Sequence, residues 1–96
     1  MKASVISPER VVFEGDVVSV VAPAFDGEVG ILPRHAPMVT LLGRGVLRLE
    51  VAGGSGEGAG GVTTRQFDVR GGFLQVADDV VRLVTESAEP IAEPRP

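Results

Sequence analysis

The residues with the greatest chemical potential are few and scattered along the chain. His35 is the only histidine, and Asp26 and Glu28 are the carboxylates nearest to it in sequence. A histidine beside a carboxylate could act as a general base, or bind a metal with further ligands. One histidine with scattered acids matches no metal-ligand spacing, and the chain has no Ser/His/Asp arrangement with a nucleophile elbow. We therefore expect His35 to be a loop residue with a structural or interface role, and we expect no metal and no catalytic residue.

Three other features could suggest chemistry, but each has a structural interpretation. Asp78-Asp79 is typical of a hairpin turn rather than of a catalytic carboxylate pair. The glycine-rich segment 53–61 has no following helix, and it lacks the lysine of a phosphate-binding loop, so we interpret it as a flexible hairpin connection. Gly71-Gly72 is expected to supply positive φ angles at a turn or bulge.

Length and composition limit the class of protein. The chain has 96 residues, enough for one domain, and it has no cysteine for disulfides or thiolate metal sites. Its net charge of −4 and its scattered arginines make nucleic acid an unsuitable partner. No apolar run approaches the ~20 residues that cross a bilayer, and the N-terminus lacks the apolar region of a signal peptide. We therefore expect no direct membrane insertion.

The elements expected to carry these residues are short strands. Valine is the commonest residue, 13 glycines and 7 prolines punctuate the chain, and no sustained helical period occurs. In the segment 46–51, Leu47 and Leu49 share one face with Val51, while Arg48 lies on the other. We expect strands at residues 4–7, 10–14, 17–23, 28–32, 38–42, 46–51, 62–70, 73–77 and 80–86.

This spacing predicts an all-β sandwich or barrel. Both faces of segment 17–23 are too apolar for contact with water alone, so one of them is expected to meet a partner. Residues 1–87 would form the domain. Residues 88–96 hold three prolines and little apolar bulk, and we expect a disordered or extended tail there. From the residues alone, we expect a non-enzymatic interaction module.

A resemblance to a known family then appears at residues 27–40, GEVGILPRHAPMVT. This segment resembles the N-terminal β-sandwich domain of the epsilon subunit of F-type ATP synthase. That family typically shows Gly-Glu-apolar-Gly-apolar-apolar-Pro-Gly-His-Ala-Pro at this place. Residues 5–10 (VISPER), 13–17 (FEGDV) and 71–76 (GGFLQV) agree in order and spacing. The resemblance covers about residues 3 to 87.

The resemblance implies a ten-stranded antiparallel β-sandwich in the central stalk of a proton-translocating ATP synthase. Such a domain binds the gamma subunit along one side and contacts the polar loops of the membrane c-ring at one end. It performs no chemistry, needs no cofactor and helps to couple ring rotation to ATP synthesis. The implied location is peripheral, on the cytoplasmic face of the bacterial inner membrane.

The same resemblance implies which residues contact these partners. Those assigned to the c-ring and gamma end are Glu28, Ile31, Leu32, Arg34, His35 and Met38. Ser7 and Thr40 are assigned to gamma contact. Among them, Glu28 and His35 are the polar groups best suited to fix the register of an interface.

Two departures from the family pattern carry expectations of their own. Arg34 replaces the commoner glycine, and an arginine would be strained there if φ is positive. The family usually continues into a C-terminal helical hairpin that can inhibit hydrolysis or bind ATP. The proline-rich end of this sequence cannot form those helices, so we expect no inhibitory arm and no bound ATP.

Two alternatives belong to other functional classes. The chain could be a stand-alone adaptor or small-ligand binder that shares only the fold, which would require a concave pocket. It could also be an enzyme that uses His35 with Asp26 or Glu28.

Overall fold

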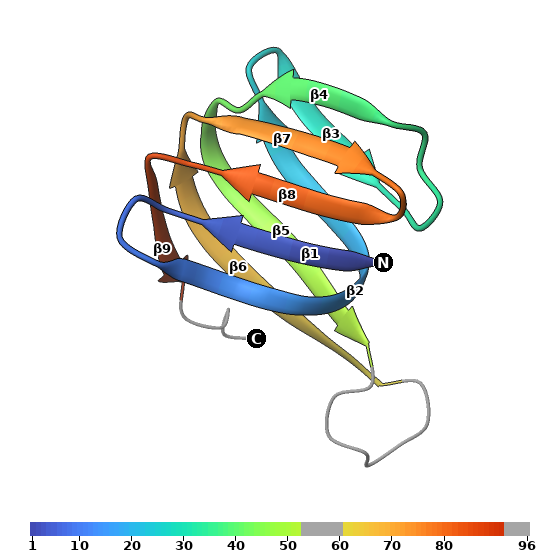
Figure 1. Ribbon diagram of the computed structural model, residues 1–96. Helices are drawn as coiled ribbons and strands as arrows, with labels where there is room; N and C mark the ends of the chain where they lie inside the picture. The colour runs from blue at the N-terminus through green and yellow to red at the C-terminus, as the bar shows by residue number, and fades with distance from the viewer. Residues whose placement is uncertain (53–60, 92–96) are drawn as a thin grey trace.

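The computed structural model describes residues 1–52 and 61–91, and within those ranges it contains nine β-strands and no helix. The strands are β1 (Lys2–Ile6), β2 (Val11–Ala24), β3 (Gly27–Ile31), β4 (Met38–Leu41), β5 (Arg44–Ala52), β6 (Val62–Arg70), β7 (Phe73–Ala77), β8 (Val80–Val84) and β9 (Ser87–Ile91) (Figure 1). No helix in the described ranges is long and apolar enough to cross a membrane.

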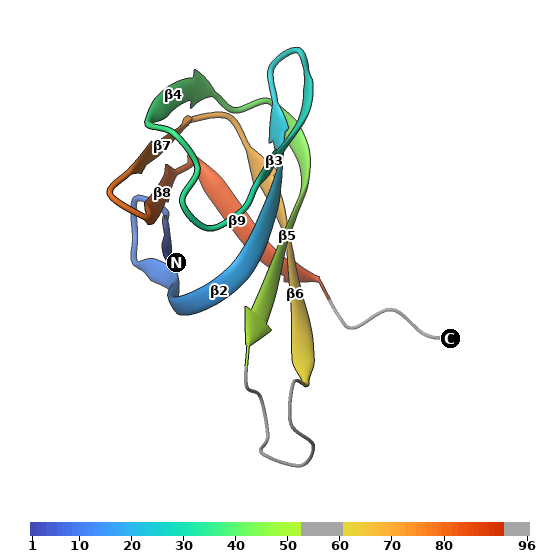
Figure 2. The ribbon, with the colours of Figure 1, turned by 90° about the vertical axis from the view of Figure 1, so that its right-hand side faces the viewer.

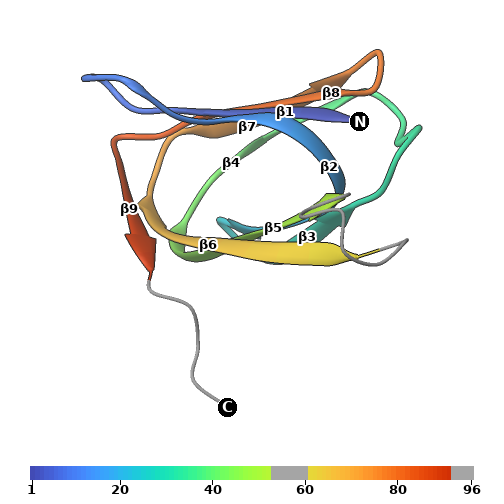
Figure 3. The ribbon, with the colours of Figure 1, turned by 90° about the horizontal axis from the view of Figure 1, so that it is seen from below.

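The strands form two layers. The front sheet has the order β4-β7-β8-β1-β2, and the back sheet has the order β3-β2-β5-β6-β9. Figure 3 shows the two layers from below, with β2 curving from one into the other. The predicted all-β sandwich is therefore confirmed. The expectation that it is wholly antiparallel is wrong for one pair, because β1 and β8 run parallel.

The second strand is longer than its sequence predicts. A break was expected at Gly15-Asp16, but these residues pair with Ala3 and Lys2, so β2 continues through them. Its register against β5 shifts after Val17, where the strand enters the back sheet. Counted once in each sheet, β2 brings the nine described strands to the ten that the resemblance implies.

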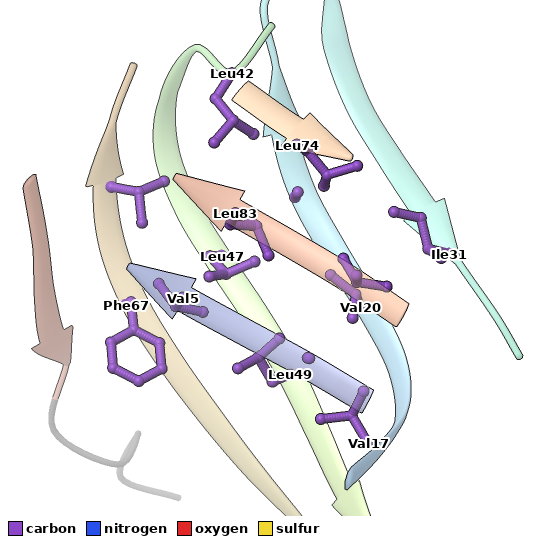
Figure 4. Packing of buried hydrophobic residues seen from close by; sticks show 14 of the residues in the cluster. Val5, Val17, Val20, Ile31, Leu42, Leu47, Leu49, Phe67, Leu74 and Leu83 are labelled. Carbon is purple, nitrogen blue, oxygen red and sulfur yellow. The ribbon is translucent and has the colours of Figure 1, made fainter. Parts of the chain in front are cut away.

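The core lies between the two sheets and is almost wholly aliphatic (Figure 4). Leu47 and Leu49 of β5 are fully buried and Arg48 is exposed, as the alternation predicts. Phe67 and Val69 are buried in the same way on β6. Burial of each such side chain stabilises the fold by roughly 1.5–3 kcal/mol. The other large side chains with full burial are Val5, Val17, Val20, Ile31, Leu74, Val76, Val81 and Leu83.

The two predicted hairpins are present. β5 and β6 pair from Arg44 opposite Arg70 to Ala52 opposite Val62, so the glycine-rich segment joins adjacent strands. Residues 53–60 themselves lie outside the described ranges. β7 and β8 pair across Asp78 and Asp79, whose φ angles of 53° and 61° identify a tight two-residue turn.

The final strand corrects the expectation of a tail from residue 88. β9 pairs with β6 as an edge strand, and it includes Pro90, which edge strands tolerate because one side needs no backbone donor. The buried Thr85 hydroxyl directs the chain into this strand, since it lies 3.0 Å from Arg70 O and 3.1 Å from Ser87 O. Residues 92–96 lie outside the described ranges.

Candidate interaction surface

A row of five apolar residues crosses the outer face of the front sheet, one from each strand. Leu41 pairs with Phe73, Phe73 with Val84, Val84 with Ile6, and Ile6 with Val11. Strand neighbours of these residues point into the core, so the row itself faces outward. Leu41, Phe73 and Val11 are 61%, 41% and 55% exposed. We call these five residues the apolar row. A contiguous exposed apolar surface of this kind indicates a binding partner.

The apolar row extends at its β4 end onto the turn between β2 and β3. Phe25 lies in that turn and is 66% exposed. Its backbone N–H donates to the carbonyl of Leu41 at 3.1 Å, which places the two residues side by side. In Figure 1 this turn and the end of β4 lie together at the top of the molecule. The row therefore continues around the upper edge of the sandwich.

Ser7 and Thr40, which the resemblance assigns to partner contact, lie beside the same row. Ser7 follows Ile6, and Thr40 precedes Leu41. Ser7 is buried, and both its N–H and its hydroxyl donate to Arg10 O within their own turn, at 2.9 and 3.3 Å. Thr40 is half-buried on the inner side of β4. The exposed surface at both places is thus made by the neighbouring apolar side chains.

The segment 32–37 connects β3 to β4 at the opposite end of the front sheet, which lies on the right in Figure 1 and faces the viewer in Figure 2. We call it the 32–37 loop. His35 N–H donates to Leu32 O at 3.1 Å, with Pro33 and Arg34 between them. Arg34 has φ of 69°, so these four residues form a turn of type II character with proline in its preferred position. His35 Nδ1–H donates to Ala36 O at 2.8 Å, which fixes the imidazole against the loop.

The remaining predicted contact residues differ in their exposure. Glu28 is exposed, Leu32 is 62% exposed, and Met38 is half-buried against the core. The expectation for Ile31 is corrected, because this side chain is fully buried and cannot reach a partner without unfolding of the site. Ile31 instead anchors the start of the 32–37 loop in the core (Figure 4).

The geometry gives the enzyme alternative no support. β3 is extended, so the six residue steps from Asp26 to Leu32, where the 32–37 loop begins, span roughly 20 Å. In the described part of the chain, no hydrogen bond or ion pair joins His35 to Asp26 or Glu28.

The structure also moves the spare apolar surface away from the segment where it was expected. Val17, Val20 and Ala22 of β2 are buried in the core, because the register shift after Val17 brings both valines inward. The outer side of this part of β2 carries the half-buried Val21 and Ser19, whose hydroxyl donates to Glu50 Oε1 at 2.8 Å. The sequence did not predict the apolar row, because each strand contributes only one residue to it and the row forms only when the strands pair.

The strain at Arg34 gives a testable prediction. A positive φ destabilises a non-glycine residue by about 1–2 kcal/mol, and replacement by glycine removes this strain. Glycine is also more flexible in the unfolded chain, which lowers the gain in stability by roughly 0.5–1 kcal/mol. We expect Arg34→Gly to raise the free energy of unfolding by about 0.5–1 kcal/mol, or the melting temperature by roughly 2–8 °C. Thermal unfolding followed by far-ultraviolet circular dichroism measures this.

The matched control is Arg44→Gly, which removes an exposed arginine from strand β5, where φ is not positive. This control should lose about 0.5–1 kcal/mol, because glycine weakens a strand. An equal loss of stability in both variants would contradict the strain at Arg34.

Comparison with known proteins agrees with this geometry. The family described as the ATP synthase delta/epsilon chain β-sandwich domain matches residues 1–91. The ATP synthase epsilon chain of Leptospira borgpetersenii is 40% identical over 86 residues, which is 90% of this chain and 61% of the relative. The epsilon chain of Carboxydothermus hydrogenoformans is 42% identical over 89 residues, or 93% of this chain and 60% of the relative. The chain thus spans about three fifths of the length of these relatives.

Solved structures extend the likeness to three dimensions. A chain of the Euglena gracilis mitochondrial ATP synthase, in a structure that includes its c-ring, matches with a TM-score of 0.79 and 26% identity. The match covers 97% of this chain and 54% of that chain. A chain in the central stalk and c-ring structure of the Tetrahymena thermophila enzyme shares the fold, with a TM-score of 0.72, 15% identity, and coverage of 92% and 64%. A family match over residues 1–91 and a shared sandwich lead to one conclusion: this chain belongs to the ATP synthase delta/epsilon chain family, as its β-sandwich domain.

Proposed function

We propose that this chain is a non-catalytic subunit of the central stalk of a proton-translocating ATP synthase, where it links the gamma subunit to the c-ring. Its relatives are named as epsilon chains, and the similar Euglena chain comes from a structure that contains a c-ring. In this role the chain transmits torque and carries out no reaction itself. It would lie peripherally, on the cytoplasmic face of a bacterial inner membrane, held there by its protein partners.

The observation that carries this proposal is the apolar row. Permanent interfaces are more apolar than ordinary protein surface, and they carry fewer charges at their centre. The row provides five adjacent apolar residues on one face, with Phe25 at its edge. The outer face of the back sheet also exposes Val46 and Val62, but polar pairs separate them, with Arg48 opposite Gln66 and Glu50 opposite Thr64. We assign the gamma subunit to the apolar row for this reason.

The 32–37 loop is suited to a different kind of contact. Leu32 projects an apolar side chain from it, while Arg34 and His35 supply polar groups, and the turn and its prolines limit the freedom of the backbone. Together with Glu28, these groups could fix the register of an interface with a polar surface. We assign the polar loops of the c-ring to this end of the sandwich, with Met38 as a partly buried support.

Gel filtration of the chain mixed with the gamma subunit from the same source tests the proposal. We expect the two proteins to elute together as a one-to-one complex, because the apolar row would remain exposed in the free chain. Separate elution of two folded proteins would contradict the assignment of gamma to this surface and would favour an adaptor that shares only the fold.

A further inference from the structure

The turn between β7 and β8 contains two aspartates with similar backbones but different contacts. Asp78 and Asp79 both have positive φ angles. The Asp79 carboxylate reaches across to the 32–37 loop, where its Oδ1 accepts the backbone N–H of Arg34 at 2.8 Å. The two residues are 45 positions apart in sequence. Asp79 therefore connects two loops that the chain order leaves far apart.

Asp79 also contacts the start of β1. Its Oδ2 lies 3.6 Å from the α-ammonium group of Met1, and its backbone carbonyl accepts the N–H of Lys2 at 3.1 Å. In Figure 1 the β7–β8 turn, the 32–37 loop and the N-terminus all lie at the right-hand end of the front sheet. The hydrogen bond from the Arg34 N–H is the main reason that the pKa of the Asp79 carboxyl lies below its ordinary value. Burial opposes this effect in part, and the Met1 ammonium group adds to the lowering. The carboxylate is therefore a charged acceptor at neutral pH.

The turn and the prolines stiffen the loop itself, but few hydrogen bonds in the described ranges fix its position against the rest of the chain. Pro33 and Pro37 have no backbone N–H to donate. The bonds from His35 N to Leu32 O and from His35 Nδ1 to Ala36 O both stay within the loop. Among the described residues, the Arg34–Asp79 bond is the one hydrogen bond that ties the loop to another part of the chain. Without it, the loop would have to be ordered by the partner at the moment of binding, which weakens affinity.

We propose that Asp79 is a positioning residue that holds the 32–37 loop in the orientation in which it contacts the rotor. This inference rests on the proposed function, since it supposes that the loop is a contact surface. It assigns no direct partner contact to Asp79, which acts through the backbone of Arg34.

Three variants separate the hydrogen bond from the turn. Asp79→Gly removes the acceptor and tolerates the positive φ angle, while Asp79→Asn keeps an acceptor oxygen and removes the charge. Asp78→Gly is the matched control, because it changes the other residue of the same turn. Each variant is measured by the exchange rate of the Arg34 amide in the free chain, by nuclear magnetic resonance, and by affinity for the isolated complex of gamma subunit and c-ring.

We expect Asp79→Gly to speed exchange at Arg34 at least tenfold and to weaken rotor binding about three- to tenfold. Asp79→Asn should restore most of both properties, and Asp78→Gly should change neither. Unchanged exchange in Asp79→Gly would overturn the inference, and so would faster exchange with undiminished affinity. If the unaltered chain does not bind the rotor, both the proposed function and the inference are wrong. The exchange rate of the Arg34 amide then shows separately whether Asp79 holds the loop.

Discussion

Replacing Gly72 with alanine is expected to abolish or nearly abolish folding of this domain. An alanine Cβ at this position would lie 1.9 Å from Val84 O and 2.7 Å from Thr85 Cα. Both are backbone atoms, so no side-chain rotation can relieve the clash. Gly72 also has φ of 102°, a region that side chains rarely occupy. We expect a loss of about 3–5 kcal/mol, which is a large part of the total stability of a small domain. Because the chain has no tryptophan or tyrosine, far-ultraviolet circular dichroism during urea unfolding is the suitable measurement.

The adjacent Gly71 provides a matched control. Its φ is 63°, and a Cβ there would first meet the Glu86 carboxylate at 3.4 Å, which is the movable end of a side chain. Gly71→Ala should therefore lose only about 1–2 kcal/mol, from backbone strain alone. Equal stability of the two variants would show that the close approach of β7 to β8 is not needed. The position matters for the interaction surface as well, because Phe73 of the apolar row follows Gly72 directly.

The second large effect is expected at the apolar row itself. The double variant Leu41→Gln with Phe73→Gln replaces two neighbouring exposed side chains at one end of the row. Its thermal stability should change little, by about 0.5 kcal/mol per site, because neither side chain belongs to the core. Its affinity for the gamma subunit, measured by titration calorimetry, should fall at least about 100-fold, since a few large side chains of an interface carry most of its binding energy.

The control for this variant places the same substitutions on the other sheet. Val46 and Val62 are also exposed, but they lie on β5 and β6 of the back sheet, away from the apolar row. Val46→Gln with Val62→Gln should bind gamma within about threefold of the unaltered chain, as expected outside an interface centre. Loss of binding in this control, with normal binding of the Leu41 and Phe73 variant, would assign gamma to the back sheet instead.

Local patterns in the sequence predicted those parts of the fold that depend on local physics. The alternation at Leu47, Arg48 and Leu49 identified strand β5 and its buried face, because a strand between core and solvent repeats every two residues. The Asp78-Asp79 turn was predictable, since aspartate tolerates positive φ. These features need no knowledge of distant parts of the chain.

Features that arise from distant pairing could not be predicted in this way. The parallel pairing of β1 with β8 joins residues about eighty positions apart, and it sets Ile6 beside Val84. The sequence of β9 does not look like a strand, because it contains Pro90 and Glu89 and has little apolar content. The strand is held instead by pairing with β6 and by the Thr85 hydroxyl.

The candidate site shows the same division. A loop was expected between the strands predicted at 28–32 and 38–42, and it is present but begins one residue earlier, at residue 32. The expectation of strain at Arg34 depended on the sign of its φ angle, which is positive. Ile31 belongs to the motif at residues 27–40 and is buried in the core, which a motif alone cannot reveal. The Arg34–Asp79 hydrogen bond depends on the approach of two loops that are distant in sequence, so no local sequence pattern could predict it.

ATP-driven proton pumping into vesicles tests most directly whether this chain couples the gamma subunit to the c-ring. The measurement uses the ATP synthase of the same source, reconstituted without its epsilon chain, with this chain added in increasing amounts. We predict that pumping per ATP hydrolysed rises with added chain and saturates at one chain per enzyme. Undiminished ATP hydrolysis with no gain in pumping, although the chain is bound to the enzyme, would contradict the proposed role.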